Sequence, residues 1–369
     1  MLICRQKVHG YIVTDIRVFS EIEKRGHEQV AFFHYPELGL KTIISIHTTQ
    51  LGPALGGCRM RLYQDEILAL DDVLRLSEGM TYKSSLAGLD LGGGKAVIIA
   101  DPALKVNRAE IFKKFGECLN ALNGRYLTAE DMGTSVEDIM NVRSVSPHAA
   151  GLAVSLGGGG DPSPWTARGV FMSIVAACER KFDSKELAGI GVAVQGVGNV
   201  GSALVELLVA AGANVTITDT VTARLTDAKA KLKVQTVGPD EIYDVPCDVF
   251  APCAAGQTIN KETLKRLSCS IIAGAANNQL QDAAVYCLIT QRKMLYCPDF
   301  VVNAGGVINV AAELVPGGYK KEWVTAKVDA IYHTIHRILD EADLRDQFPE
   351  VVAIDLAKER LKNPSLRFS

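Results

Sequence analysis

Two lysines lie in apolar, glycine-rich stretches, although lysine is normally a solvated surface residue. Lys83 ends the stretch Gly-Met-Thr-Tyr-Lys, and Lys95 follows three consecutive glycines and precedes an apolar run at 96–100. A lysine that loses water or approaches another cation gives up its proton more readily, which can make an amine base near neutral pH. The alternative is a glycine turn followed by a solvated lysine, and these residues alone do not decide between the two.

A carboxylate that could exchange protons with such an amine is Asp131, in the stretch Thr-Ala-Glu-Asp-Met-Gly-Thr. The competing interpretation is helix capping, because Asp, Thr and Ser all cap helices and a helix is expected to begin near Ser135. A substrate with a carboxylate, an amine and a transferable α-hydride would use all three side chains. Lys83 would hold the carboxylate, while Lys95 and Asp131 would transfer protons.

A glycine motif of the form Gly-x-Gly-x-x-Gly follows an expected strand and opens an expected helix, the context that makes it specific for dinucleotides. Its residues are Gly196, Val197, Gly198, Asn199, Val200 and Gly201. Asp219 ends the next expected strand, where a carboxylate would bind the ribose hydroxyls and repel a 2′-phosphate. This predicts NAD as the coenzyme. Arg224 leaves NADP as the alternative coenzyme. The structural alternative is a glycine turn that binds no nucleotide.

The elements that must hold these residues change character along the chain. A hairpin at 30–35 and 42–47 and helices at 65–80 and 109–122 precede a linker of glycine and proline at 156–164, where Ser163 and Pro164 would open a helix to about 181. Strands are then expected at 190–194, 215–218, 248–251, 270–273 and 294–297, with helices at 199–211, 322–343 and 350–362. This alternation predicts an α/β fold with a parallel sheet covered by helices on both faces.

Length and composition restrict the class of protein further. The 369 residues suggest two domains, and the net charge of −3 offers no electrostatic footprint for nucleic acid or an anionic membrane. No apolar run approaches the roughly 20 residues of a membrane span, and the N-terminus does not resemble a signal peptide. The nine cysteines include no Cys-x-x-Cys pair, which argues against a metal site and favours a cytoplasmic protein.

The stretch 89–102, which contains Lys95, resembles the signature of the glutamate/leucine/phenylalanine/valine dehydrogenase family, and most closely its leucine-specific members. Further blocks resemble the family at 51–57, 79–83, 128–131 and 303–310. The resemblance implies a substrate-binding and oligomerisation domain at 1–150, onto which a C-terminal helix at about 345–369 packs. It also implies a Rossmann-type NAD-binding domain at 151–344, with a cleft between the two, and a homo-oligomer.

The resemblance also assigns roles to single residues. It implies that Lys83 binds the substrate carboxylate, that Lys95 is catalytic and that Asp131 is its acid/base partner. Thr166 would lie near the nicotinamide amide, and Asn278 would lie against both coenzyme and substrate. The side chain of the substrate would meet Leu55, Gly56, Ala129, Val307 and Val310, although core packing is an equal alternative for the two valines.

The reaction implied is reversible oxidative deamination, in which an L-amino acid, NAD and water give a 2-oxo acid, ammonium and NADH. The pocket residues carry no cation for a second carboxylate, which favours leucine, isoleucine and valine over glutamate. A hydrophobic pocket discriminates by only about 1–3 kcal/mol per methylene, so these three substrates should overlap. Trp165 and the segment 315–323 depart from the family pattern, so an aromatic substrate, phenylalanine or tryptophan, is the alternative. A non-catalytic NAD-binding sensor subunit is the alternative of another class, and Lys83, Lys95 and Asp131 argue against it.

Overall fold

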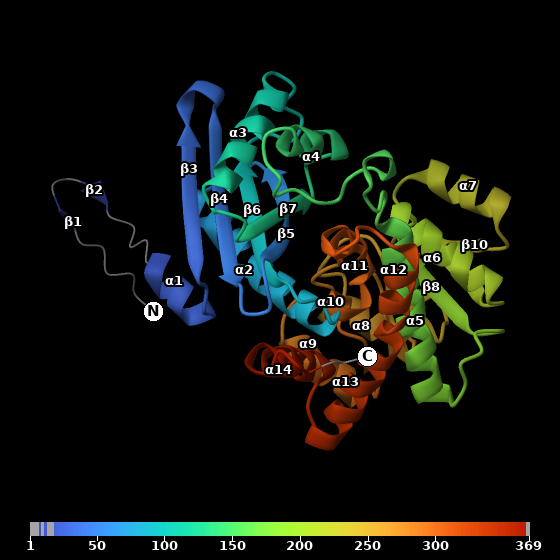
Figure 1. Ribbon diagram of the computed structural model, residues 1–369. Coiled ribbons are helices and arrows are strands. Elements are labelled where there is room, and N and C mark those ends of the chain that lie inside the picture. Colours follow the sequence, from blue (N-terminus) through green and yellow to red (C-terminus); the bar gives the residue numbers. More distant parts are fainter. Residues whose placement is uncertain (1–6, 9–10, 13–17, 367–369) are drawn as a thin grey trace. The chain divides into compact units, whose positions relative to one another are not determined.

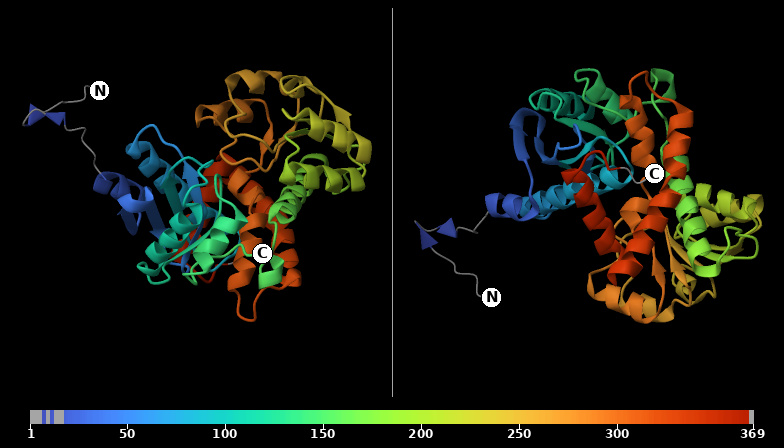
Figure 2. Two further views of the ribbon diagram at one scale, coloured as in Figure 1. Left: turned by 90° about the horizontal axis from the view of Figure 1, so that it is seen from above. Right: turned by 60° about the horizontal axis from the view of Figure 1, so that its bottom comes forward.

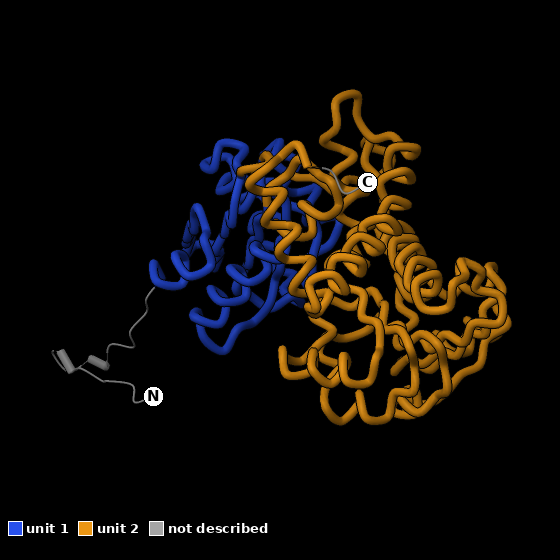
Figure 3. Tube along the Cα trace, turned by 90° about the horizontal axis from the view of Figure 1, so that it is seen from below, with its two compact units in different colours: residues 1–49, 53–80, 93–148 blue, residues 50–52, 81–92, 149–369 orange. Residues whose placement is uncertain are grey.

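The computed structural model describes residues 7–8, 11–12 and 18–366. The chain divides into two compact units (Figure 3). Unit 1 comprises the residues up to 49 together with 53–80 and 93–148, and unit 2 comprises 50–52, 81–92 and 149–369. Lys95 and Asp131 therefore belong to unit 1, whereas Lys83 belongs to unit 2.

Unit 1 is built on a five-stranded mixed sheet with the strand order β3-β4-β6-β5-β7. The strands are β3 Gln29–Tyr35, β4 Leu40–Thr48, β5 Ala54–Arg61, β6 Gly92–Ile99 and β7 Tyr126–Glu130 (Figure 1). The predicted hairpin is confirmed, because β3 and β4 pair antiparallel around a tight turn at Pro36–Leu38. β5 and β7 run parallel, so their carboxyl ends lie at the same edge of the sheet.

Four helices of the described residues belong wholly or in part to unit 1. They are α1 Val18–Arg25, α2 Glu66–Leu86, α3 Arg108–Asn120 and α4 Val136–Arg143, and the boundary between the units falls within α2. Leu70, Val73 and Leu74 of α2 pack with Ile43 and Val97 of the sheet, as their helical spacing predicts. α2 is longer than expected, so Lys83 lies within the helix and not after it.

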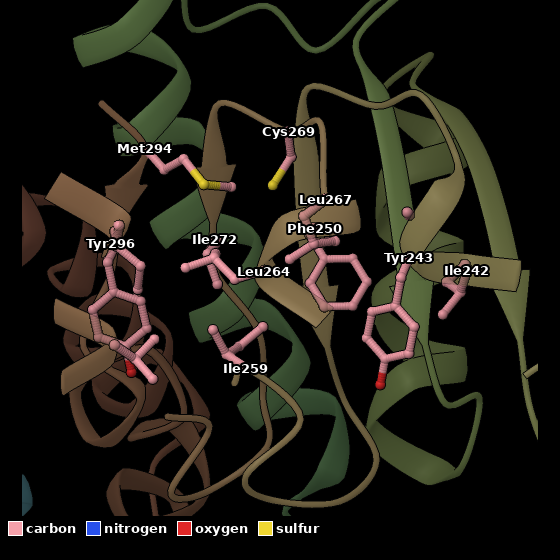
Figure 4. Packing of buried hydrophobic residues seen from close by; sticks show 13 residues of the cluster. Ile242, Tyr243, Phe250, Ile259, Leu264, Leu267, Cys269, Ile272, Met294 and Tyr296 are labelled. Atoms are coloured by element: carbon pink, nitrogen blue, oxygen red, sulfur yellow. The ribbon is translucent and has the colours of Figure 1, made fainter. Parts of the chain in front are cut away.

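Unit 2 contains a six-stranded sheet in which every recorded strand pair is parallel, as the alternation of strands and helices predicts. Its strands are β8 Gly191–Gln195, β9 Asn214–Thr218, β10 Gln235–Thr236, β11 Val249–Pro252, β12 Ile271–Ile272 and β13 Leu295–Tyr296. The order β10-β9-β8-β11-β12-β13 is that of the Rossmann dinucleotide-binding fold. The sheet packs on a buried cluster that includes Phe250, Ile259 and Ile272 (Figure 4).

Helices surround this sheet, and α5 and α13 lie side by side (Figures 1 and 2). The helices are α5 Ser163–Phe182, α6 Asn199–Ala210, α7 Thr222–Lys231, α8 Lys261–Arg266, α9 Ala284–Gln291, α10 Asp299–Val302, α11 Gly305–Ala311, α12 Lys321–Asp329, α13 Ile331–Arg345 and α14 Pro349–Lys362. Short 3-10 helices lie between these elements, at Val154–Leu156, Glu241–Asp244 and Ala312–Leu314.

Two expectations about these helices were wrong in detail. The helix expected at 322–343 is divided into α12 and α13 at Ala330, which keeps helical angles (φ −65°, ψ −15°). Apolar residues on both sides of the break, such as Val328 and Ile331, are buried. Ser163 is the first residue of α5 and Pro162 occupies the cap position, one residue earlier than expected.

The C-terminal helix α14 is fixed by a buried arginine. The guanidinium of Arg360 is fully buried and donates hydrogen bonds to the carbonyl oxygens of Ser85 at 3.0 Å and Leu89 at 2.7 Å. It also forms an ion pair with Asp90 at 2.6 Å. A buried guanidinium is stable only when its donors are satisfied, so these contacts bind α14 to the last turn of α2 and to the segment that follows it.

Candidate active site

A buried lysine, Lys95, and a partly buried carboxylate, Asp131, form an ion pair in unit 1. Lys95 lies in β6 and Asp131 directly follows β7, and the Lys95 Nζ atom is 2.8 Å from Asp131 Oδ2. The Lys95 side chain is only 7% exposed. The three glycines before it belong to strand β6, so the interpretation of a glycine turn with a solvated lysine is wrong. At Gly94 a Cβ would lie 2.6 Å from the ring of Tyr126, which explains why no side chain is tolerated there.

A second cation, which sequence analysis missed, also contacts Asp131. Arg59 lies in β5 directly after Cys58. Cys58 is aligned with Glu130 of β7, the residue before Asp131, so Arg59 and Asp131 lie at matching positions. Its Nε atom donates to Asp131 Oδ2 at 3.1 Å. Burial raises the pKa of Asp131, but the charges of Lys95 and Arg59 outweigh this effect, and the pKa is lowered. An arginine inside the otherwise uncharged stretch Gly-Gly-Cys-Arg-Met was the signal that could have identified it.

Asp131 does not cap a helix. The N-cap of α4 is Ser135, whose hydroxyl accepts a hydrogen bond from the backbone N–H of Asp138. The Asp138 carboxylate in turn accepts from the backbone N–H of Ser135 at 2.8 Å. This reciprocal capping box satisfies the start of α4 without Asp131, so the capping interpretation is wrong. The Asp131 carboxylate instead contacts its two cations and the backbone N–H of Met132.

Lys83 lies near the end of α2, and its Nζ atom is 3.4 Å from the Oδ1 atom of Asn277. The same oxygen accepts a hydrogen bond from Asn303 Nδ2 at 2.8 Å. Asn277 was not predicted as a site residue, whereas its neighbour Asn278 was. Asn278 has a left-handed backbone with φ +52°, a conformation that asparagine tolerates better than most residues. The structure therefore brings Lys83 to the loop of unit 2 that contains Asn277 and Asn278, which we call the asparagine loop.

The glycine motif adopts the geometry of a phosphate-binding turn between β8 and α6. Gly196 has φ +96°, and a Cβ on Gly201 would lie 2.0 Å from the Gly196 carbonyl oxygen, so both positions require glycine. Gly198 is the N-cap of α6, and the space around the position of its missing Cβ is open. The first N–H groups of a helix are free to bind an anion. The turn, the open space and the helix start therefore fit a dinucleotide.

Asp219 follows β9, next to this turn. Its carboxylate accepts hydrogen bonds from the backbone N–H of Val197 at 2.9 Å and of Val221 at 2.8 Å. Burial raises the pKa of Asp219, but the two backbone donors outweigh this effect and the pKa is lowered. Arg224 Nη1 lies at 3.4 Å from the same carboxylate. Asp219 is thus an anion at the end of the second strand, the position at which a ribose is bound in this fold.

The other predicted residues fall into two groups. Leu55 and Gly56 lie in β5, and Ala129 lies in β7, where it is aligned with Gly57. The place of a Cβ on Gly56 is taken by the Gly94 carbonyl oxygen, at 1.7 Å, so its glycine allows two strands to approach. In unit 2, the Thr166 hydroxyl would lie 2.8 Å from a Cβ on Gly306, which brings the start of α5 to α11.

Val307 and Val310 lie three residues apart in α11, and neither belongs to the buried core, unlike Ile308 and Ala311 of the same helix. This arrangement disfavours simple core packing for the two valines. No helix of the described residues is long and apolar enough to cross a membrane. Within the same residues, no cluster of His, Cys, Asp and Glu could hold a metal ion.

Two family patterns match the chain. The first, described as Glu/Leu/Phe/Val dehydrogenase, dimerisation domain, matches residues 27–145. The second, described as Glutamate/Leucine/Phenylalanine/Valine dehydrogenase, matches residues 157–229 and 216–350. Together they span both units and include the lysines, Asp131 and the glycine motif.

Individual relatives are similar over nearly the full length. Leucine dehydrogenase of Bacillus subtilis is 46% identical over 94% of both chains. Phenylalanine dehydrogenase of Thermoactinomyces intermedius is 45% identical over 94% of both chains. L-tryptophan dehydrogenase of Nostoc punctiforme is 41% identical over 94% of this chain and 96% of the relative. The amino acid named differs among these three relatives.

Solved structures are similar as well. The crystal structure of L-tryptophan dehydrogenase from Nostoc punctiforme has a TM-score of 0.83 and 38% identity, and the match covers 94% of this chain and 99% of that one. Glutamate dehydrogenase of Plasmodium falciparum has a TM-score of 0.78 at 19% identity over 93% of this chain and 84% of that one, a similarity of fold alone.

Proposed function

Because the chain belongs to the glutamate/leucine/phenylalanine/valine dehydrogenase family, we propose that it deaminates branched-chain L-amino acids by reversible, NAD-dependent oxidation. The chain is an amino acid dehydrogenase that uses a nicotinamide dinucleotide. The specific parts of the proposal are the substrate, which is leucine, isoleucine or valine, and the coenzyme, which is NAD. The products are a 2-oxo acid, ammonium and NADH.

The single observation that carries this proposal is the ion pair of Lys95 and Asp131. An amine and a carboxylate at 2.8 Å can exchange a proton directly, which is what both halves of a deamination require. Asp131 takes a proton from the substrate ammonium group, because only a neutral amine can become an imine. Lys95 then activates the water that attacks the imine carbon, and Asp131 returns a proton to the departing nitrogen.

Substrate binding is assigned to Lys83. Its ammonium group would bind the α-carboxylate of the amino acid as a point charge, while it also donates to Asn277 Oδ1 at 3.4 Å. Asn303 donates to the same oxygen of Asn277 and so fixes the orientation of the amide. Asn278, in its left-handed conformation, is assigned to contacts with both coenzyme and substrate.

The coenzyme is assigned to the turn of the glycine motif. The nicotinamide ring, when bound, accepts the α-hydride of the amino acid. The backbone of Gly196, Gly198 and the start of α6 would hold the pyrophosphate, with Val197, Asn199, Val200 and Gly201 completing the turn. Asp219 would accept hydrogen bonds from the ribose hydroxyls, which supports NAD over NADP. Thr166 is assigned to the nicotinamide amide.

The side chain of the substrate is assigned to Leu55, Gly56, Ala129, Val307 and Val310. None of these residues carries a charge, which supports an aliphatic substrate over glutamate. Phenylalanine or tryptophan is a second candidate, because the phenylalanine and tryptophan dehydrogenases are 45% and 41% identical to this chain. Trp165, beside Thr166, is a further difference that favours testing the aromatic substrates.

The test is a panel of L-amino acids assayed with NAD and with NADP, with the formation of reduced coenzyme as the signal. We expect the highest kcat/KM with leucine, isoleucine or valine, and a clear preference for NAD. A highest value for phenylalanine or tryptophan would establish the second candidate. Equal use of NADP would contradict the role of Asp219. Binding of NAD without turnover of any amino acid would indicate a non-catalytic sensor subunit.

We also propose that the protein is a homo-oligomer, since residues 27–145 match a pattern described as a dimerisation domain. The mass in solution, measured by light scattering after size-exclusion chromatography, tests this. A mass of 39.7 kDa, that of one chain, at assay concentration would contradict it.

A further inference from the structure

We propose that Arg59 is a positioning residue for the reaction, which holds the Asp131 carboxylate as an anion in one fixed orientation. This inference rests on the proposed function, because it concerns the carboxylate to which that function gives the proton transfers. Nothing in the family resemblance assigned a role to Arg59. It lies on β5, between the two strands that supply Lys95 and Asp131.

The contacts at Asp131 are asymmetric. Lys95 Nζ lies 2.8 Å from Oδ2, and Arg59 Nε lies 3.1 Å from the same oxygen. The closest contacts of both cations therefore converge on Oδ2, and the backbone N–H of Met132 also donates to this carboxylate. Two cations on one oxygen fix the orientation of the carboxylate more firmly than Lys95 and the Met132 N–H would without Arg59, because one fewer contact then opposes rotation about the Cβ–Cγ bond.

Arg59 is itself held at its other end. Its Nη1 atom lies 3.0 Å from Oδ2 of Asp72 in α2, and the same oxygen accepts a hydrogen bond from the Tyr63 hydroxyl at 2.7 Å. The side chains of Arg59 and Asp72 are 14% and 11% exposed. The planar guanidinium can bind two carboxylates in different directions, which a lysine ammonium on a flexible stem cannot reproduce.

The charges at this position explain the direction of the expected change. Burial lowers the pKa of Arg59, but Asp131 and Asp72 outweigh this effect, so it stays charged. Replacement of Arg59 by a neutral side chain removes one of the two cations beside Asp131 and raises the pKa of that carboxyl. The titratable and charged groups around the carboxylate come from the sheet and from the helices that pack on it. The sheet carries Lys95, Arg59, Cys58 and Tyr126. The helices and the segment before α2 carry Asp72, Arg75, Tyr63, Arg108 and Asp138.

The decisive variant is Arg59→Gln, and its matched control is Arg75→Gln. Arg75 Nη2 binds the other oxygen of Asp72 at 2.7 Å, so the control removes a guanidinium from the same carboxylate without touching Asp131. We expect Arg59→Gln to lower kcat by roughly 10²-fold, the scale of a general acid–base contribution, with a smaller change in KM. The acidic limb of the pH profile of kcat should move upwards by about one unit. Arg59→Lys should recover part of kcat, and Arg75→Gln should match the wild type.

A second measurement does not require activity. The lowered pKa of Asp131 stabilises the folded protein above the ordinary value of 3.8, and this stability is lost as the pH falls below it. In Arg59→Gln the loss of melting temperature on acidification should be smaller and should end at a higher pH than in the wild type, because the folded-state pKa of Asp131 sets the lower end of the range. That difference should disappear when Asp131→Asn is added to both proteins, because the two changes act on one interaction.

These measurements separate the possible failures. Absence of turnover in the wild type contradicts the proposed function, and the melting curves still decide the role of Arg59. If Arg59→Gln does not fold, Arg59→Lys provides both measurements. A binding constant for NADH that is unchanged shows that unit 2 is intact in either variant. Identical pH profiles and melting curves for Arg59→Gln and Arg75→Gln would overturn the inference.

Discussion

Two partly buried carboxylates in different units show opposite behaviour. Asp131 of unit 1 is in contact with two cations, and its pKa is lowered. Glu350 of unit 2 lies in the first turn of α14, where burial, followed by the charge of the Asp299 carboxylate, raises its pKa to about 8. Oε2 of Glu350 has no hydrogen-bond partner among the described residues.

The difference shows that burial alone does not determine the charge of a carboxylate. Burial raises the pKa in both places, and the neighbours decide the outcome. Asp131 is held as an anion that can accept a proton from a substrate. Glu350 is held as a neutral acid near the aromatic rings at the start of α14, where Phe348 stacks with Tyr286 and Tyr296 at centroid distances of 4.3 Å and 5.4 Å.

The largest effect is expected from removing the amine that pairs with Asp131. Lys95→Met should lower kcat by about 10²–10⁴-fold, because proton transfer to and from the substrate nitrogen and water loses its partner. Steady-state turnover of the preferred amino acid measures this, with NADH binding as the control for folding. Turnover within a few-fold of the wild type would remove the ion pair from the mechanism.

The second test concerns Glu350. Its raised pKa means that the folded protein binds this proton more tightly than the unfolded chain, so the stabilisation is complete below pH 4.5 and is lost as the pH rises to about 8. One proton contributes a slope of at most about 1.4 kcal/mol per pH unit. Glu350→Gln should flatten the free energy of unfolding across this range, as measured by urea denaturation. Glu359→Gln, in the exposed part of the same helix, is the control and should retain the slope.

A smaller change should follow when the anion beside Glu350 is neutralised. In the wild type, the backbone N–H of Gln279 donates to Asp299 Oδ2 at 2.9 Å. Asp299→Asn keeps an oxygen that can accept this hydrogen bond, so the asparagine loop keeps its support. The pKa of Glu350 should fall, although burial, the larger cause, remains. We expect the upper end of the pH-dependent loss of stability to move down by about one unit. An unchanged end point would mean that burial acts alone.

The smallest effect is expected at Asp219, a third carboxylate, which is held chiefly by backbone donors. Arg224 is half-exposed and at 3.4 Å, and exposed ion pairs contribute about 0–1 kcal/mol. Arg224→Ala should therefore change the melting temperature and the binding constant for NAD little. A loss of NAD binding of tenfold or more would show that a cation, not the backbone, holds this carboxylate.

Much of the architecture was predictable from local patterns. The hairpin of β3 and β4, the parallel sheet of unit 2 and the turn at Gly196 were all identified, because alternation, helical spacing and glycine geometry depend on short-range physics. Boundaries were less accurate. α2 extends through Lys83, and α12 and α13 are separate helices, since helix ends depend on packing as much as on propensity.

Within the candidate site, the sequence was sufficient to nominate Lys95 and Asp131 but left each with a plain structural alternative. Those alternatives were excluded only by contacts: Lys95 is inside a strand, and Ser135 performs the capping. Arg59, Asn277 and Glu350 were missed for the same reason. Each acquires its importance from a residue far away in the chain, and no local pattern records that proximity.

Residue types and their spacing were thus enough to predict the class of fold, the glycine turn, and Lys95 and Asp131 as candidate proton-transfer residues. The charge state of each carboxylate was decided by the folded chain, because it depends on which cations or anions the sheets and helices bring within a few ångströms. Asp131 and Glu350 are both acidic residues in the sequence, and only their tertiary neighbours make one an anion and the other a neutral acid.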